Sequence, residues 1–311
     1  MKALSRFVAN VVKPSSRRRR LAATQHEAEH LEVRALLSNV TAVIRNRDLR
    51  ITGDSDNNAV QITQTPSGFI VRGLEQTTIN GGGLNSGVFL STNQPTDDVN
   101  ISFAAGGNNL VRLIDLDVED DLIVRGGQQV DAIAVVNGTI GDDVRIRTQG
   151  GSDLVLVQVN TVDSVNINTG HGDDKVAVAG TPATASVNNA RAVSVNTGRG
   201  NDELIVEGFD VSNNFNISTG SDNDAIFVRG SQLNGDLRVR MSSGDDDFFI
   251  TGSRVSGRAS VNGGSGVDHA QLFINPLVDY APSNIEGNVV ADVDERIDDL
   301  AVLFITLSNP A

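Results

Sequence analysis

The sequence of 311 residues contains no cysteine and no tryptophan, and it has a single tyrosine. The absence of cysteine excludes disulfides and thiolate metal sites, although it leaves the cellular compartment open. Aromatic residues make up only 4 % of the chain, so its 39 % of hydrophobic residues are mostly Val, Ile, Leu and Ala. Small apolar side chains suit many thin layers better than one thick globular core. No stretch approaches ~18 consecutive apolar residues, so the sequence predicts no membrane span.

Positive charge is scarce outside the N-terminal segment. Of the 25 basic and 39 acidic residues, eight and three lie within residues 1–38, which leaves 17 basic and 36 acidic residues and a net charge of −19 for the rest. A body this acidic repels nucleic acid and anionic membranes and attracts cations. We therefore expect no nucleic-acid partner, whereas a polysaccharide or protein of a cell wall, matrix or cell surface is compatible with it.

The sequence is rich in one repeated turn of glycine and aspartate. The turn is written GHGDDKVAV at 170–178, GRGNDELIV at 198–206 and GSDNDAIFV at 220–228. A fixed period of this kind indicates a repeat architecture. One longer interval contains six extra residues within AGTPATASVNNA, which we expect to form a loop. The last acidic residues of the turns follow one another at intervals of 22, 21, 28, 22, 22 and 22 residues, and they are Asp131, Asp153, Asp174, Asp202, Asp224, Asp246 and Asp268.

Each repeat predicts three short strands. Apolar and polar residues alternate before the marker aspartate, as in Val165-x-Ile167, and after it, as in Val176-x-Val178. Such alternation is typical of strands with one buried face. A third apolar position recurs between the repeats, at Ile140, Val162, Val211, Leu233 and Val255.

Three strands in coils of about 22 residues predict an all-β fold, a right-handed parallel β-helix. The handedness follows the general preference for right-handed crossovers between parallel strands. An antiparallel sandwich is the alternative, but its hairpins would need two alternating kinds of turn. Here one kind of turn recurs at one interval, so it should lie along one edge of the fold.

The recurring glycine and aspartate have a structural and a metal-binding interpretation. Glycine permits a positive φ and leaves room for the adjacent coil, and Asp or Asn accepts backbone N–H bonds across the turn. Stacked coils would also align the carboxylates in one ladder, where hydrogen bonds, solvent or bound cations must offset their repulsion. Ca²⁺, a cation that prefers oxygen ligands, is the natural candidate. The candidate ligands are Asp131, Asp153, Asp173, Asp174, Asp202, Asp224, Asp246 and Asp268.

The segment GGSGVDHAQ at 263–271 resembles the calcium-binding nonapeptide of RTX proteins, Gly-Gly-x-Gly-x-Asp-x-apolar-x. TGHGDDKVA and TGRGNDELI resemble it with Thr169 and Thr197 in the first position. The resemblance implies that Asp174, Asp202 and Asp268 are carboxylate ligands. RTX repeats recur every nine residues, whereas these recur every 22, so calcium would have to bind between neighbouring coils along one edge.

Both ends of the repeat region need protection, because an open coil exposes unpaired strand edges. We expect residues 39–95 to form an N-terminal β cap and the first coils, with turns at GDSDNN and TPSG, and residues 96–275 to form the regular coils. Residues 276–311 are expected to form a C-terminal cap. Val293, Ile297, Leu300 and Phe304 have helical spacing there, which predicts a short capping helix. The alternative is one more strand, LAVLFITL.

Residues 1–38 have the character of a targeting or sorting tail. The segment RRRRLAATQHEAEHLEVRALLS is similar to the N-terminal segment of many planctomycete surface proteins, in which an arginine cluster precedes a Leu-Glu-Pro-Arg-like motif and a Leu-Leu ending. Val33 stands where that motif often has proline. The resemblance implies export to the cell surface or the extracellular space. The matching residues are Arg17 to Arg20, Leu31, Glu32, Arg34, Leu36, Leu37 and Ser38.

Two classes of function fit this sequence. The first is an exported, non-catalytic surface or matrix β-solenoid that calcium could stabilise along the aspartate ladder. The second is a β-helical polysaccharide lyase or hydrolase, for which one acid–base site is conceivable. The scarcity of sugar-stacking aromatics and the single lysine beyond the tail favour the first class. The residues of the conceivable catalytic site are His171, Asp173, Asp174, Lys175 and Arg199.

Overall fold

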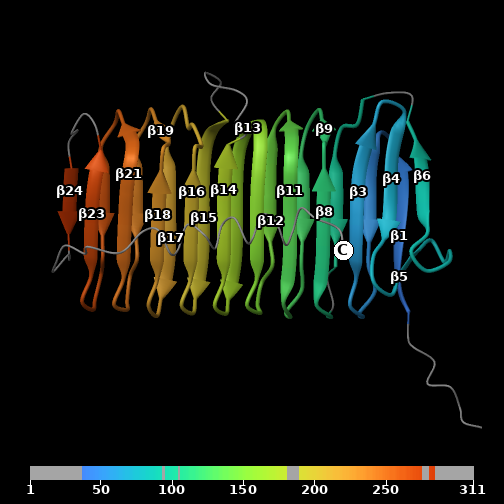
Figure 1. Ribbon diagram of the computed structural model, residues 1–311, viewed down its shortest axis with the longest axis horizontal. Helices are drawn as coiled ribbons and strands as arrows, with labels where there is room; N and C mark the ends of the chain where they lie inside the picture. The colour runs from blue at the N-terminus through green and yellow to red at the C-terminus, as the bar shows by residue number, and fades with distance from the viewer. Residues whose placement is uncertain (1–36, 93–94, 104–105, 181–188, 275–279, 284–311) are drawn as a thin grey trace, which may run out of the picture. The chain divides into compact units, whose positions relative to one another are not determined.

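The computed structural model describes residues 37–92, 95–103, 106–180, 189–274 and 280–283. The chain divides into two compact units, Met1–Ala35 and Leu36–Ala311, and every element below belongs to the second unit. The described residues form 24 strands and no helix (Figure 1). No helix that could cross a membrane therefore occurs in this part of the chain.

The strands are short, and most have the alternating burial that the sequence predicts. The first six are β1 Ser38–Arg45, β2 Asp48–Thr52, β3 Ala59–Thr65, β4 Gly68–Gly73, β5 Thr77–Ile79 and β6 Gly87–Ser91. The coils then contain β7 Val99–Ser102, β8 Asn109–Ile114, β9 Asp117–Val118, β10 Leu122–Arg125, β11 Asp131–Ile140, β12 Asp143–Arg147, β13 Leu154–His171, β14 Lys175–Gly180, β15 Ala190–Arg199, β16 Glu203–Glu207, β17 Phe215–Ser221, β18 Ala225–Arg229, β19 Gln232–Leu233, β20 Leu237–Arg240, β21 Asp247–Val255, β22 Ala259–Asn262, β23 His269–Ile274 and β24 Tyr280–Ser283.

The coils stack as a parallel β-solenoid of about seven turns, as predicted. Each strand pairs in parallel with the equivalent strand one coil away, so Phe215 on β17 lies opposite Val193 on β15 and Leu237 on β20. These partners are 22 residues apart, which is the period of the turns. The antiparallel sandwich is excluded, because the pairings from β7 onward are parallel.

Two long parallel sheets face each other across each coil. We call them sheet B, which contains β10, β12, β15, β17, β20 and β22, and sheet C, which contains β8, β11, β14, β16, β18 and β21. β13 bends from sheet C into sheet B. The third apolar position stacks as a short column at the corner, where Val211 pairs with Ala190 and Leu233.

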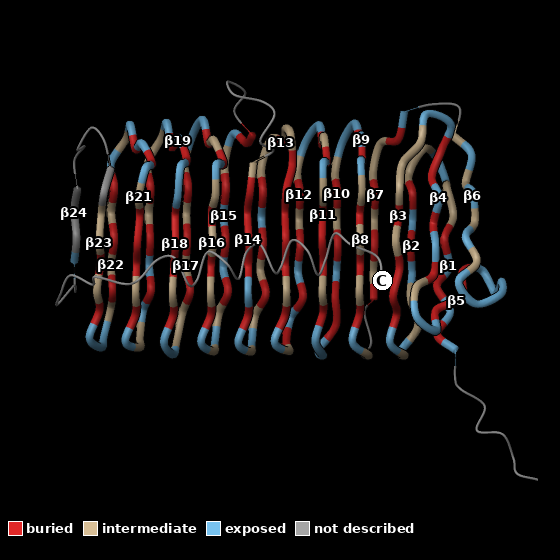
Figure 2. Tube along the Cα trace, viewed as in Figure 1, coloured by how far each residue is buried: buried red, intermediate tan, exposed pale blue. Residues whose placement is uncertain are grey.

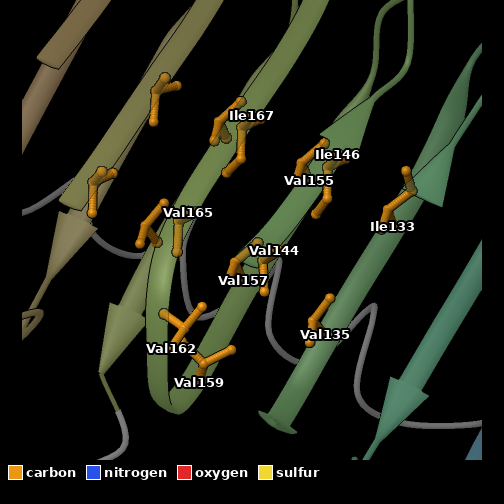
Figure 3. Close-up of a cluster of buried hydrophobic side chains, with 14 of the residues drawn as sticks. Ile133, Val135, Val144, Ile146, Val155, Val157, Val159, Val162, Val165 and Ile167 are labelled. Carbon is orange, nitrogen blue, oxygen red and sulfur yellow. The ribbon is translucent and has the colours of Figure 1, made fainter. Parts of the chain in front are cut away.

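The core consists of aliphatic side chains from the inner faces of both sheets. Val144 and Ile146 on β12 point toward Val155 and Val157 on β13 (Figure 3). These side chains are at most 1 % exposed, and the buried positions recur from coil to coil along the stack (Figure 2). Burying each such side chain contributes about 1.5–3 kcal/mol. The thin, repeated layers explain why few aromatic residues are needed.

The N-terminal strands form antiparallel hairpins, of which only the one at the predicted TPSG turn matches a predicted turn. β1 pairs antiparallel with β2, and β3 pairs antiparallel with β4 through the turn at residues 65–68. β6 continues this antiparallel pairing on β4. The hairpins join the solenoid because β2 pairs in parallel with β7 and β3 with β8.

The register locates the six extra residues. Val165 pairs with Val193 and Val178 with Val206, both 28 residues apart, so the insertion lies between Val178 and Ala190. Residues 181–188 of the expected loop lie outside the described residues, as do residues 1–36 of the expected tail at 1–38 and the expected helix of the C-terminal cap; Ser38, the last residue of that expected tail, is the first residue of β1. β24 adds a last parallel strand to β22.

Candidate functional site

The glycines of the recurring turn have the conformation and the close packing that the sequence predicts. The turn leads from the end of a sheet B strand to the start of the next sheet C strand. Gly170, Gly198 and Gly220 have φ values of 100°, 107° and 106°. A Cβ atom on any of them would lie closer than 3.0 Å to the carbonyl oxygen of the preceding coil. The backbones of successive turns therefore stack in direct contact, which only glycine permits.

The marker aspartates form one buried column, which we call the inner ladder. Its members are Asp131, Asp153, Asp174, Asp202, Asp224, Asp246 and Asp268, and none is more than 3 % exposed. The backbone N–H of each aspartate from Asp131 to Asp246 donates to Oδ1 of the aspartate in the next coil; Asp202 N, for example, lies 2.9 Å from Asp224 Oδ1. The sequence predicted that the aspartate accepts a backbone N–H across its own turn. In the structure, Oδ1 of each aspartate from Asp153 to Asp268 accepts the N–H of a neighbouring coil instead.

Asparagine begins the inner ladder. Asn109 Oδ1 accepts the backbone N–H of Asn58 at 3.2 Å, and Asn109 Nδ2 donates to Asp131 Oδ1 at 2.8 Å. Asp131 Oδ2 in turn accepts the N–H of Gly127 at 2.7 Å. A neutral amide therefore serves at the same position as the aspartates, which shows that the hydrogen bond between coils does not need a negative charge.

A column of threonines lies beside the inner ladder, and sequence reasoning missed it. Thr148 Oγ1 donates to the carbonyl of Thr169 at 3.2 Å, and Thr169 Oγ1 donates to that of Thr197 at the same distance. Each hydroxyl also lies within hydrogen-bond reach of the aspartate five residues later. The signal in the sequence was a threonine at that fixed offset. The column comprises Thr148, Thr169, Thr197 and Thr219, all fully buried.

Hydrogen bonding leaves one oxygen of several aspartates without a donor. A threonine hydroxyl has one proton, and where the carbonyl of the next coil accepts it, the neighbouring carboxylate oxygen receives none. Buried polar atoms without a partner are rare, because each loses its hydration without compensation. The atoms concerned are Oδ2 of Asp153, Asp174 and Asp202, which lie beside such threonines, and also Oδ2 of Asp224, where Thr219 Oγ1 has no partner among the described residues either, and of Asp246, where Met241 stands in place of the threonine.

Burial changes the acidity of the inner ladder. Desolvation is the main cause that raises the pKa of Asp153, Asp224 and Asp246 from 3.8 to about 7 and that of Asp202 to about 6. Repulsion between successive carboxylates adds to this effect, and the threonine and backbone hydrogen bonds oppose it. Protonation can thus offset the repulsion, in addition to the hydrogen bonds, solvent and cations expected from the sequence. Where a threonine lies beside the aspartate, as at Asp153, Asp202 and Asp224, a protonated Oδ2 would donate to its hydroxyl and leave no atom of the pair unpartnered.

Asp173 lies in a second, exposed column, which we call the outer ladder. Asp173 Oδ1 accepts the N–H of Asn201 at 2.8 Å, Asn201 Oδ1 that of Asn223 at 3.1 Å, and Asn223 Oδ1 that of Asp245 at 2.8 Å. Here the later coil donates to the earlier one, the reverse of the inner ladder. The two ladders therefore tie each pair of neighbouring turns together in both directions.

The arrangement of the inner carboxyls suits hydrogen bonding between coils. Calcium takes about six to eight oxygen ligands, yet each inner Oδ1 from Asp153 to Asp268 already accepts a backbone N–H. Within the described residues, no group of three or more His, Asp and Glu side chains is placed to hold a metal ion. Calcium binding by the eight candidate aspartates stays a prediction. Hydrogen bonding between neighbouring coils is the competing role of these carboxyl groups.

The residues of the conceivable catalytic site are divided between the surface and the interior. His171 and Arg199 are exposed neighbours in register on β13 and β15. Lys175 pairs with Glu203 at 3.0 Å on the adjacent sheet. Asp174 is fully buried and Asp173 belongs to the outer ladder, so the five side chains do not line one open site.

A third set of aspartates lies at the opposite corner of the coils. Asp121 N donates to Asp98 Oδ1 at 3.2 Å and Asp143 N to Asp121 Oδ1 at 3.1 Å. Arg145 forms ion pairs with both Asp121 and Asp143. These acidic residues thus also serve contacts between coils.

Comparisons with known proteins give no relative: the chain matches no protein-family model, no curated protein and no solved structure.

Proposed function

We propose that this chain is an exported, non-catalytic module of a cell surface or extracellular matrix, with the β-solenoid as its scaffold. The observation that carries the proposal is the use of the recurring aspartates. Their oxygens accept backbone N–H groups of neighbouring coils, so the most abundant candidate catalytic groups hold the stack together. A repeated scaffold with a strongly acidic body suits display in an aqueous, cation-containing environment.

Export is supported by the N-terminal segment. The arginine cluster at Arg17 to Arg20 and the Leu-Leu pair at Leu36 and Leu37 resemble the sorting segment of planctomycete surface proteins. The absence of cysteine means that folding outside the cell does not depend on disulfides. A chain that needs no disulfides and no thiolate metal can fold before or after export.

The test of this proposal is surface labelling of cells that express the full chain or a chain without residues 1–38. We expect a membrane-impermeant reagent to label the full chain and not the truncated one, while both show the same β-type circular dichroism. A reporter protein fused behind residues 1–38 should reach the surface as well. Equal labelling of both chains would contradict the export proposal.

The polysaccharide lyase or hydrolase alternative is tested separately. Two hollows of the surface lie near the N-terminal hairpins, one beside Ser55 and Glu75 and one beside Gln64 and Asp117, away from His171. We expect no release of reducing ends or unsaturated sugars from neutral or acidic polysaccharides. Release that disappears in a His171→Ala variant would establish the enzyme instead.

Removal of divalent cations tests the calcium prediction. Because hydrogen bonds already hold the inner ladder, we expect the unfolding temperature to change by less than about 2 °C between excess chelator and millimolar Ca²⁺. Thermal unfolding followed by circular dichroism measures this difference. A stabilisation by Ca²⁺ of several degrees that Mg²⁺ does not reproduce would show that calcium binds to the folded coils.

A further inference from the structure

The outer faces of the two sheets differ in character. On sheet B, the central outward positions of successive coils are mostly polar, including Asn166, Ser194, Asn216 and Arg238, and Asn166 and Ser194 are exposed. On sheet C, the equivalent positions form a largely apolar stripe. In register, the stripe consists of Arg112, Ala134, Leu156, Ala177, Ile205, Phe227, Phe249 and Gln271.

The stripe is buried although it faces away from the core. Leu156 points opposite to the core residues Val155 and Val157, yet it is 0 % exposed, and Ala134 and Ala177 beside it are at most 1 % exposed. Alanine neighbours are too small to cover a leucine on an open sheet face. Within the described part of the chain, the side chains packed on these three come from the same face: Leu110, Ala132, Val136, Leu154 and Ile205.

Burial extends along the stripe toward the last coils. Phe227 and Phe249 are 5 % and 8 % exposed, with their ring centroids 6.3 Å apart. Polar atoms on the same face, Glu203 Oε1 and Gln271 Oε1, have also lost contact with water. A layer that lies over about six successive coils accounts for all of these observations.

We propose that residues 284–311 of this chain pack along the outer face of sheet C and cover the apolar stripe. β24 ends at Ser283 in the last described coil, so these residues start beside one end of the stripe. Seven coil steps from Gln271 to Arg112 span about 34 Å. The segment reaches about 40 Å as a helix and about 90 Å when extended, so either conformation is long enough.

The composition of the segment fits this role. Residues 300–307, LAVLFITL, form the most apolar stretch after the coils, while the acidic residues are concentrated in DVDERIDD just before it. An apolar stretch of this kind gains free energy by covering an apolar face. The C-terminal segment therefore covers the side of the solenoid, in addition to any role at its end.

The absence of native cysteine permits a direct accessibility test. Leu156→Cys places one thiol in the stripe, and Ser194→Cys places one on the exposed face of sheet B as a matched control. In the full chain we expect the Leu156→Cys thiol to react with a maleimide at least roughly tenfold more slowly than the Ser194→Cys thiol. Deleting residues 284–311 should remove this protection and leave the control rate unchanged.

A second variant decides the matter if the truncated chain does not fold. Leu300→Asp together with Phe304→Asp in the full chain should expose the Leu156→Cys thiol while the β-type circular dichroism is retained. Equal reactivity of the two thiols in the unaltered full chain would show an open face and overturn the proposal. Protection that survives these changes would also overturn it, and light scattering would then distinguish a second copy from residues 1–36 as the cover.

Discussion

Replacing Gly220 with alanine is expected to lower the free energy of unfolding by about 3 kcal/mol or more. The φ value of 106° at this position strains any residue with a side chain, and the new Cβ would lie closer than 3.0 Å to the carbonyl oxygen of Gly198. Because that oxygen belongs to the stacked backbone, relief of the clash has to separate the two coils. Positive φ alone costs about 1–2 kcal/mol, and overpacking typically adds about 1–3 kcal/mol. Urea or thermal unfolding measures the loss.

Substitutions at two further glycines separate the backbone strain of a positive φ from the steric clash with the neighbouring coil. Gly230 has a φ of 60°, and a Cβ added there would have no atom within 4 Å, so Gly230→Ala should show the backbone strain alone. Gly83 has neither a positive φ nor a close neighbour, so Gly83→Ala should be neutral or slightly stabilising. If Gly220→Ala were no more destabilising than Gly230→Ala, close stacking of the turns would not be what selects glycine there.

The period of the turns and the alternation of apolar residues were sufficient to predict the fold. Val193, Phe215 and Leu237 occupy one column because side chains at a fixed period must align when coils stack. The strand pairing at the N-terminal end of the solenoid was less predictable. The hairpin of β3 and β4 was recognisable from the turn at Pro66 and Gly68, whereas the hairpin of β1 and β2 and the joining of both hairpins to parallel coils follow from tertiary contacts.

The inner ladder was predictable as a column, but its environment was not. Spacing aligns Asp202 with Asp224 but does not say whether the column faces water or the core. That distinction decides the chemistry, because an exposed carboxylate binds cations readily whereas a buried one loses hydration. The side chain of Asp224 is buried beside the hydroxyl of Thr219, and the fixed offset between these two residues in the sequence does not by itself show that both are buried.

The burial of Leu156 also differs from what the sequence pattern predicts. Its neighbours Val155 and Val157 follow the alternation that predicts a strand with one buried face, which would leave Leu156 in water. Continuous apolar runs such as LVLV at 154–157 are typical of strands covered on both faces. The run was a sign that both faces of this strand are buried, and period-2 reasoning overlooked it.

Stability should fall as the pH rises from about 4 to about 7. The folded-state pKa values of Asp153, Asp224 and Asp246 are raised to about 7, above the value of 3.8 expected for an unfolded chain. Between about pH 4 and about pH 7 the native state holds protons that the unfolded state has lost. For each such proton, the free energy of unfolding falls by about 1.4 kcal/mol for every unit by which the pH rises. The stabilising contribution of these three protonated carboxyl groups is complete below about pH 4 and is lost above about pH 7. Urea unfolding at several pH values measures the slope.

Asp224→Asn should therefore stabilise the protein at pH 8, by roughly 1–4 kcal/mol. The amide keeps Oδ1 as the acceptor for the N–H of Asp202, and its Nδ2 can donate to the Thr219 hydroxyl, as a protonated carboxyl would. Asn109 already shows that an amide fits this ladder, since it both accepts from Asn58 and donates to Asp131. At about pH 3, where Asp224 is protonated in both the folded and the unfolded state, the variant and the native protein should be about equally stable.

Asp245→Asn in the outer ladder is the matched control, because Asp245 is exposed and its Oδ1 accepts the N–H of Val267 at 2.9 Å. This substitution also removes one carboxylate and keeps the acceptor, yet it should change the pH dependence of stability only slightly, because the Asp245 charge is a minor cause of the raised pKa of Asp246. A loss of stability in Asp224→Asn at pH 8 would mean that the folded protein needs a charged carboxylate at this position. That outcome would favour a bound cation on the inner ladder, because a compensating positive charge would make a buried carboxylate preferable to an amide of the same shape.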